Sequence, residues 1–179
     1  LDRRPGPDYL SGPGNLRGFD VKTGKRKWIF HTVPQKGEFG YDTWIVPGQA
    51  EQATNTGVWA PFTADPELGT VYAGVELPQA DWIGRTRHGD ALFTETLVAL
   101  DVETGQRKWH YQTEHHGLWD CDICSAATLC DVPMPGGRTV MALALPTKQA
   151  FLFVLDRAPG SPAWPIEERK FEAGNVPGE

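Results

Sequence analysis

Short apolar runs that end in polar turns are the main pattern of this chain. Residues 97–100 are four consecutive apolar residues, followed by Asp101 and, four positions later, Gly105. An apolar run without alternation predicts a strand covered on both faces. The aspartate can accept turn N–H groups and glycine tolerates positive φ, so we expect the chain to reverse here. Residues 107–111, which include Trp109, would return as an outer strand.

The same hairpin pattern occurs at three places in the chain. Residues 18–28 read GFDVKTGKRKW, residues 99–109 read ALDVETGQRKW, and a more divergent copy at residues 154–164 reads VLDRAPGSPAW. Repeats of this kind indicate a stacked or radial array. The copies are unevenly spaced, which fits four-stranded blades with variable loops better than a rigid solenoid. We therefore expect the three closing tryptophans, Trp28, Trp109 and Trp164, to occupy equivalent positions between blades.

Further strands are predicted between and after the copies. Residues 58–64 and 70–75, joined by a turn at 65–69, are interpreted as the first two strands of the blade that Trp109 completes. The next blade would use residues 125–132, 138–145 and 151–155 and a strand containing Trp164. No long helical period occurs. The prediction is an all-β fold, a partial β-propeller of about two and a half four-stranded antiparallel blades.

The predicted organisation places the whole of residues 1–179 in one propeller domain. The expected parts are the end of a blade (1–32), a linker (33–57), a blade (58–113), a second blade (125–168) and a connecting loop (169–179). The sequence begins and ends within this architecture, so we interpret it as a piece of something larger whose remaining blades are absent. An alternative is a degenerate or truncated gene product that folds poorly because its sheet edges are open.

Charge and hydropathy narrow the function classes. The chain has 17 basic and 23 acidic residues, a formal net charge of −6, so it offers no basic surface for nucleic acid or an anionic membrane. A small neutral substrate is the more natural partner. No segment approaches the roughly 20 apolar residues of a membrane span, and Leu1 does not begin a secretory signal.

Five blocks in fixed order carry a resemblance to a known family. They are residues 55–61 (NTGVWAP), 87–93 (RHGDALF), 97–109, 115–120 (HHGLWD) and 147–157 (TKQAFLFVLDR). The chain resembles the pyrroloquinoline quinone (PQQ)-dependent dehydrogenases, the quinoprotein glucose and alcohol dehydrogenases. The double histidine in the fourth block favours the glucose-dehydrogenase-like branch.

The resemblance implies a fold and an activity. The family has an eight-bladed quinoprotein propeller, and its members oxidise a sugar or alcohol hydroxyl by hydride transfer to PQQ, beside Ca²⁺ or another cation. It also implies an electron acceptor, ubiquinone or a cytochrome, and a periplasmic or cell-envelope location. The isolated 179-residue chain would be inactive, since half of the quinone pocket lies in missing blades.

The resemblance also assigns roles to residues of this chain. Asp120 matches the catalytic base, which also binds the cation, Trp59 the indole floor under the quinone, and Lys148 the basic residue that hydrogen-bonds the quinone oxygens. The chemistry suits these types, since a carboxylate can accept a hydroxyl proton and a flat indole can stack on a planar cofactor. Without the family blocks, these residues would be interpreted as a turn aspartate, a packing tryptophan and a solvated strand end.

One expected metal ligand departs from the family pattern. Where many relatives carry an asparagine ligand, this chain reads Val75-Glu76-Leu77, so Glu76 is the candidate second ligand because only it offers an oxygen. Asp122, two residues after Asp120, is a candidate for one more oxygen, as in lanthanide-using members and in many glucose-type relatives.

Two points stay open in the sequence. A non-catalytic propeller scaffold that binds proteins at the cell envelope would show the same repeats, although it has no reason to keep Trp59, Asp120 and Lys148 together. Cys121 and Cys124 have the spacing of a redox or zinc half-site, but no second cysteine pair accompanies them. For these two and Cys130 we expect a disulfide or buried thiols in preference to a structural metal.

Overall fold

Three antiparallel sheets make up the computed structural model, which describes residues 12–78, 84 and 87–169. The first sheet pairs β1 (Leu16–Phe19) with β2 (Arg26–Phe30). The second has the order β3-β4-β5-β6, and the third β7-β8-β9. Their bounds are Thr63–Asp65, Thr70–Val75, Thr96–Asp101 and Arg107–Gln112 in the second sheet, and Thr128–Pro133, Thr139–Pro146 and Leu152–Asp156 in the third. The all-β prediction is confirmed.

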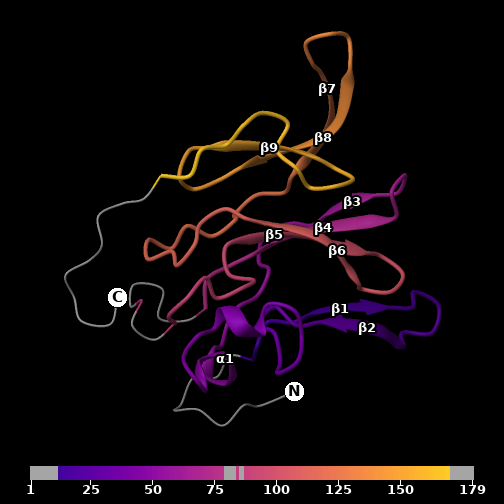
Figure 1. The fold of residues 1–179 in the computed structure, drawn as a ribbon. Helices are drawn as coiled ribbons and strands as arrows, with labels where there is room; N and C mark the ends of the chain where they lie inside the picture. Colours follow the sequence, from indigo (N-terminus) through magenta and orange to yellow (C-terminus); the bar gives the residue numbers. More distant parts are fainter. Residues whose placement is uncertain (1–11, 79–83, 85–86, 170–179) are drawn as a thin grey trace.

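The sheets stack in chain order, with the second between the other two (Figure 1). The strands β4 and β5 turn alternate side chains to opposite faces. One face joins a core shared with the third sheet, which includes Tyr72, Leu97, Leu143 and Leu155. The other face, with Val98 among its members, packs toward the first sheet through Trp28 and Phe30. Both faces of β5 are therefore covered, as the unbroken apolar run predicts.

The segment between the first two sheets has little regular structure. It contains a single 3₁₀ turn, η1 (Tyr41–Thr43), and the four-residue α1 (Gln49–Gln52). Among the residues described, no helix is long and apolar enough to cross a membrane.

The repeated hairpins have matching local geometry. In the β5–β6 turn, Asp101 Oδ1 accepts the N–H groups of Glu103 and Thr104 at 3.1 and 3.0 Å and the Thr104 hydroxyl at 2.9 Å. Asp20 makes the corresponding contacts in the β1–β2 turn. These hydrogen bonds, with the threonine hydroxyl contributing most, hold the pKa of both aspartates below the ordinary value.

Two of the repeat tryptophans dock on the turn of the next sheet in the same way. Trp28 Nε1 donates to the carbonyl oxygen of Val102 at 3.0 Å, and Trp109 Nε1 donates to that of Arg157 at 3.0 Å. The indoles lie on Gly105 and Gly160, where an added Cβ would meet ring atoms at 2.5 and 2.4 Å. Both glycines also have positive φ, so each turn needs glycine for its backbone and for the indole.

Two strand predictions are wrong in detail. The strand expected at residues 58–64 is only β3, Thr63–Asp65, and it begins after Pro61, which has no N–H for a ladder. The strand expected around Trp164 is an isolated bridge between Leu155 and Pro162. Prolines at 162 and 165 flank Trp164 and remove ladder donors, so the third sheet has three strands in the described residues. Trp164 is 48% exposed, and no further sheet follows it in the described residues on which it could dock as Trp28 and Trp109 do.

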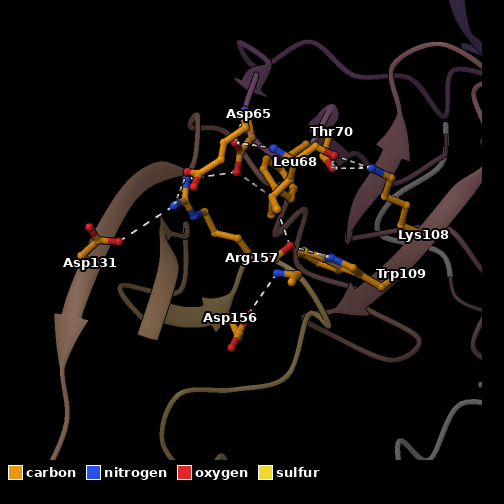
Figure 2. Close-up of polar contacts among 11 residues, drawn as sticks. Asp65, Leu68, Thr70, Lys108, Trp109, Asp131, Asp156 and Arg157 are labelled. Atoms are coloured by element: carbon orange, nitrogen blue, oxygen red, sulfur yellow. Dashed lines mark hydrogen bonds and ion pairs between the residues drawn. The ribbon is translucent and has the colours of Figure 1, made fainter. Parts of the chain in front are cut away.

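Arg157, directly after β9, links the second and third sheets (Figure 2). Its Nη1 donates to Asp65 Oδ2 at 3.0 Å, and its Nη2 lies 3.9 Å from Asp131 Oδ1 on β7. Its backbone carbonyl accepts hydrogen bonds from Trp109 Nε1 and the Tyr72 hydroxyl, both at 3.0 Å. One residue thus joins β3, β4, β6 and β7 near the buried core.

Candidate active site

Three residues that are distant in sequence meet where β4, β6 and β8 end. Trp59 precedes β3, Asp120 lies between β6 and β7, and Lys148 lies in the turn from β8 to β9. Lys148 Nζ is 3.3 Å from Asp120 Oδ2 and 5.7 Å from the centroid of the Trp59 ring. The structure therefore brings together the three side chains to which the sequence assigns catalytic and cofactor roles.

Asp122 connects these three residues. Its Oδ2 accepts a hydrogen bond from Trp59 Nε1 at 3.2 Å and lies 3.4 Å from Lys148 Nζ. Its Oδ1 accepts the backbone N–H of Leu77 at 2.9 Å, just beyond the end of β4. Sequence reasoning weighed Asp122 only as an extra metal oxygen and missed this bridging position. The signal was its spacing, because Asp120 and Asp122 are two residues apart in an irregular loop.

Trp59 differs from the docking tryptophans in exposure. It is 55% exposed, whereas Trp109 is 6% exposed. Its N–H is held by a carboxylate instead of a backbone carbonyl of the next turn. A large indole left open and fixed at its edge offers a flat apolar face to a planar ligand.

Asp120 also differs from the turn aspartates of the repeats. Asp101 accepts N–H groups of its own turn, while the Asp120 carboxylate faces Lys148 from another sheet. Asp120 has φ 53°, a conformation uncommon for a residue other than glycine, and its backbone carbonyl accepts a hydrogen bond from Lys148 Nζ at 2.9 Å. Its side chain is 37% exposed, so an oxygen is accessible to a ligand.

The neighbouring carboxylates favour the charged form of Lys148. Burial alone lowers the pKa of the ammonium, but the negative charges of Asp122 and Asp120 outweigh it, and the net pKa is raised above the ordinary value. The residue is a fixed positive charge beside the open indole and not a freely solvated strand end.

Glu76 is held in a different contact. Its Oε1 accepts the N–H of Gly57 at 2.8 Å, and its own N–H donates to the Gly57 carbonyl at 3.0 Å. It immediately precedes Leu77, whose N–H is bound by Asp122. Metal ligation by Glu76 stays a prediction.

The cysteine prediction is corrected by the structure. Cys121, Cys124 and Cys130 are all free thiols of intermediate burial, so the described residues contain neither a disulfide nor a fully buried thiol. The three lie in an irregular loop and at the start of β7, where no pair of them is bonded.

The donor set fits a planar quinone together with a hard cation. Trp59 would provide the stacking face and Lys148 a positive hydrogen-bond donor at its edge, since both already lie side by side. Ca²⁺ binds carboxylate oxygens, which Asp120 offers. The Asp120 side chain is accessible and is not enclosed by the N–H groups of a turn.

Comparisons with known proteins identify a matching family and similar sequences. The family described as "Glucose/ethanol/alcohol dehydrogenase, beta-propeller domain", a PQQ family, matches residues 5–179. The glycerol dehydrogenase large subunit of Gluconobacter thailandicus is 38% identical over 93% of this chain, and the quinoprotein glucose dehydrogenase of Gluconobacter oxydans is 36% identical over 93%.

The solved structures show the same fold. The quinohemoprotein alcohol dehydrogenase of Comamonas testosteroni superposes with a TM-score of 0.75 at 29% identity, over 92% of this chain and 26% of that one. The chain spans 22% and 20% of the two sequence relatives. Its stacked antiparallel sheets are consistent with part of such a propeller.

Proposed function

The chain belongs to the family of PQQ-dependent dehydrogenases with a β-propeller domain, and from this premise we propose that the protein oxidises a sugar or alcohol hydroxyl with Asp120 as the general base. The observation that carries the proposal is the meeting of Asp120, Lys148 and Trp59 at one end of the second and third sheets. A non-catalytic scaffold has no need for this combination.

Asp120 would accept the proton of the substrate hydroxyl. Its carboxylate is accessible and is contacted by an ammonium group from the next sheet, which fixes its direction. A positioned carboxylate is a competent general base where it can reach the hydroxyl at hydrogen-bond distance. Proton removal leaves negative charge on the substrate oxygen, which Lys148, 3.3 Å from the Asp120 carboxylate, would help to stabilise.

Trp59 and Asp122 would set the geometry of the pocket. The indole gives a flat floor, and the hydrogen bond to Asp122 keeps its plane from rotating. Asp122 also draws Lys148 toward the indole, so one carboxylate orients both cofactor-binding side chains. We therefore assign Asp122 a positioning role.

Pyrroloquinoline quinone, when bound, supplies the two-electron acceptor, and Ca²⁺ or another cation held by Asp120 and Glu76 would favour the ionised substrate oxygen. The electron acceptor proposed for the whole protein is ubiquinone or a cytochrome, and its location the periplasm or cell envelope. Because the chain spans about a fifth of its relatives, the isolated 179 residues would show little turnover.

The test is dye-linked oxidation of sugars and alcohols by the purified full-length protein that contains this chain, reconstituted with PQQ and Ca²⁺. Asp120→Asn keeps the shape of the side chain but cannot accept the proton, so turnover per bound cofactor should fall roughly 100-fold to 10,000-fold. Asp131→Asn is the matched control, because Asp131 is an exposed carboxylate near Arg157, away from the indole. Near-parental turnover in Asp120→Asn would place the base elsewhere.

A further inference from the structure

A second group of side chains adjoins the candidate active site through Cys121, the residue after Asp120, and is used by none of the steps above. The carboxylates of Glu95 and Glu114 and the thiol of Cys121 have ligand atoms within 4.8 Å of one another. Glu95 lies immediately before β5, while the other two follow β6. The cluster therefore joins the entry of one strand to the loop that carries Asp120.

Glu95 is the unusual member of this cluster. It is fully buried, and neither carboxylate oxygen has a hydrogen-bond partner within the described part of the chain. The backbone N–H of Cys121 is near enough to influence it electrostatically but does not meet hydrogen-bond geometry. Burying a carboxylate without compensation is costly, so a group in this position calls for a cation or a proton.

The surrounding backbone is shaped to accept this carboxylate. A Cβ added at Gly117 would lie 1.9 Å from Glu95 Oε2, so only glycine leaves room for it. Arg87 is also buried nearby, and one of its nitrogens donates to the Gly117 carbonyl. The guanidinium lowers the pKa of Glu95 only partly, since burial and the charge of Glu114 raise it to about 8.

The Cys121 thiol lies beside the two carboxylates, so its sulfur can serve as a third ligand. A cation bound among the three groups would displace the protons of the thiol and of any protonated carboxylate to solvent.

We propose that Glu95, Glu114 and Cys121 bind a divalent transition-metal ion such as Zn²⁺, at a site distinct from the Asp120 carboxylate. A thiolate with two carboxylates suits Zn²⁺ or Co²⁺ better than Ca²⁺, which takes oxygen ligands only. Ligand atoms on one tetrahedral zinc ion lie roughly 3.4–3.6 Å apart, so small side-chain movements close the site. The ion would brace the 113–122 loop against β5.

Gln149 contacts the cluster from the turn between β8 and β9. Gln149 Nε2 donates to Glu114 Oε2 at 3.0 Å. A water molecule can complete the tetrahedral coordination. Gln149 follows Lys148 directly, so an ion here would also restrain the turn that carries the active-site ammonium.

The test uses the purified protein, freed of metal by a chelator and titrated at pH 8 with Co²⁺ in the absence of quinone and substrate. We expect a thiolate-to-cobalt charge-transfer band that saturates at one equivalent and is displaced by Zn²⁺. Oxygen-only binding at Asp120 cannot produce this band, so the result does not depend on the proposed oxidation.

Matched cysteine variants identify the ligand. Cys124→Ser should keep the band and Cys121→Ser should lose it. Glu114→Gln and Glu95→Gln should each weaken Co²⁺ binding at least about tenfold. The absence of a thiolate band in the parent protein, or its persistence in Cys121→Ser, overturns the proposal. Because the absence of the band in the unsubstituted protein already overturns the proposal, the proposal remains testable even if one variant fails to fold.

Discussion

Two ion pairs between the same two sheets have opposite surroundings. Arg157 meets Asp65 at 3.0 Å with side chains 10% and 1% exposed, whereas Lys148 meets Asp120 at 3.3 Å with side chains 33% and 37% exposed. The buried pair is enclosed by Trp109 and Tyr72, which fix the Arg157 carbonyl. The open pair borders an exposed indole. Similar charges therefore stabilise the stack in one place and leave reactive groups accessible in the other.

The energetic reason is solvation. Removing one partner of a buried pair leaves an uncompensated charge out of water, whereas a half-exposed charge that loses its partner is solvated. The Arg157 pair should thus govern stability, and the Lys148 pair should govern ligand binding and turnover. The following predictions test this division.

Asp65→Asn should have the largest effect on folding. It leaves Arg157 with only the exposed carboxylates of Glu67 and Asp131, which should reduce the free energy of unfolding by up to about 3–5 kcal/mol. Asp120→Asn should change it by less than about 1 kcal/mol, because that pair is partly solvated. Urea denaturation of both variants measures this, and equal losses would contradict the division.

Glu95 should make stability fall as pH rises. Its folded pKa is about 8, against an ordinary value of 4.5, so the folded state keeps a proton that the unfolded chain has lost. The stabilising contribution is complete below about pH 4.5 and is lost as pH rises toward 8, at up to about 1.4 kcal/mol per pH unit. Urea denaturation in the presence of a chelator, repeated between about pH 4.5 and 8, should show this fall in stability with pH. The variant Glu95→Gln should not show it. If the stability of Glu95→Gln fell with pH as steeply as that of the unsubstituted protein, another group would be responsible.

Lys148→Met should lower turnover with little effect on folding. Loss of the positive charge beside the substrate oxygen and the quinone edge should reduce kcat/KM by about 100-fold, as for other electrostatic donors. Lys108→Met is the control, because Lys108 donates to the carbonyl of Leu68 and to Thr70 within its own sheet. If both variants lose the same activity, the effect reflects general damage.

The smallest effect should come from an exposed pair. Lys27 and Glu103 form an ion pair between the first two sheets, with Glu103 well exposed. Lys27→Ala should leave the free energy of unfolding nearly unchanged, and any difference should shrink at high salt. A loss as large as that of Asp65→Asn would show that exposure does not decide the strength of these pairs.

Much of the fold follows from local sequence. The apolar run before Asp101 and the Asp-Thr-Gly turns predict the hairpins, because hydrogen bonding within the turn is local. The prediction fails at Trp164. The third copy of the repeat forms its turn, but the prolines that flank Trp164 prevent the strand that should follow. Similarity to the other two copies predicted a strand there, but it took no account of the backbone N–H groups that the prolines lack.

The candidate site was predictable only through the order of the blocks. Trp59, Asp120 and Lys148 come from three loops, and their meeting depends on the register and stacking of two sheets, which no single segment encodes. Asp122 was missed as the connecting residue for the same reason. The buried Glu95 did leave a signal, a carboxylate within the otherwise uncharged run of residues 91–100.

The most direct measurement is the affinity of the purified, cofactor-free protein for PQQ, determined by equilibrium dialysis with Ca²⁺ present. Trp59→Ala removes the open indole face and should weaken binding about tenfold to a hundredfold. Trp164→Ala, which removes another half-exposed indole, should bind as the parent does. Unchanged affinity in Trp59→Ala would contradict the central claim that this end of the sheets is the quinone site.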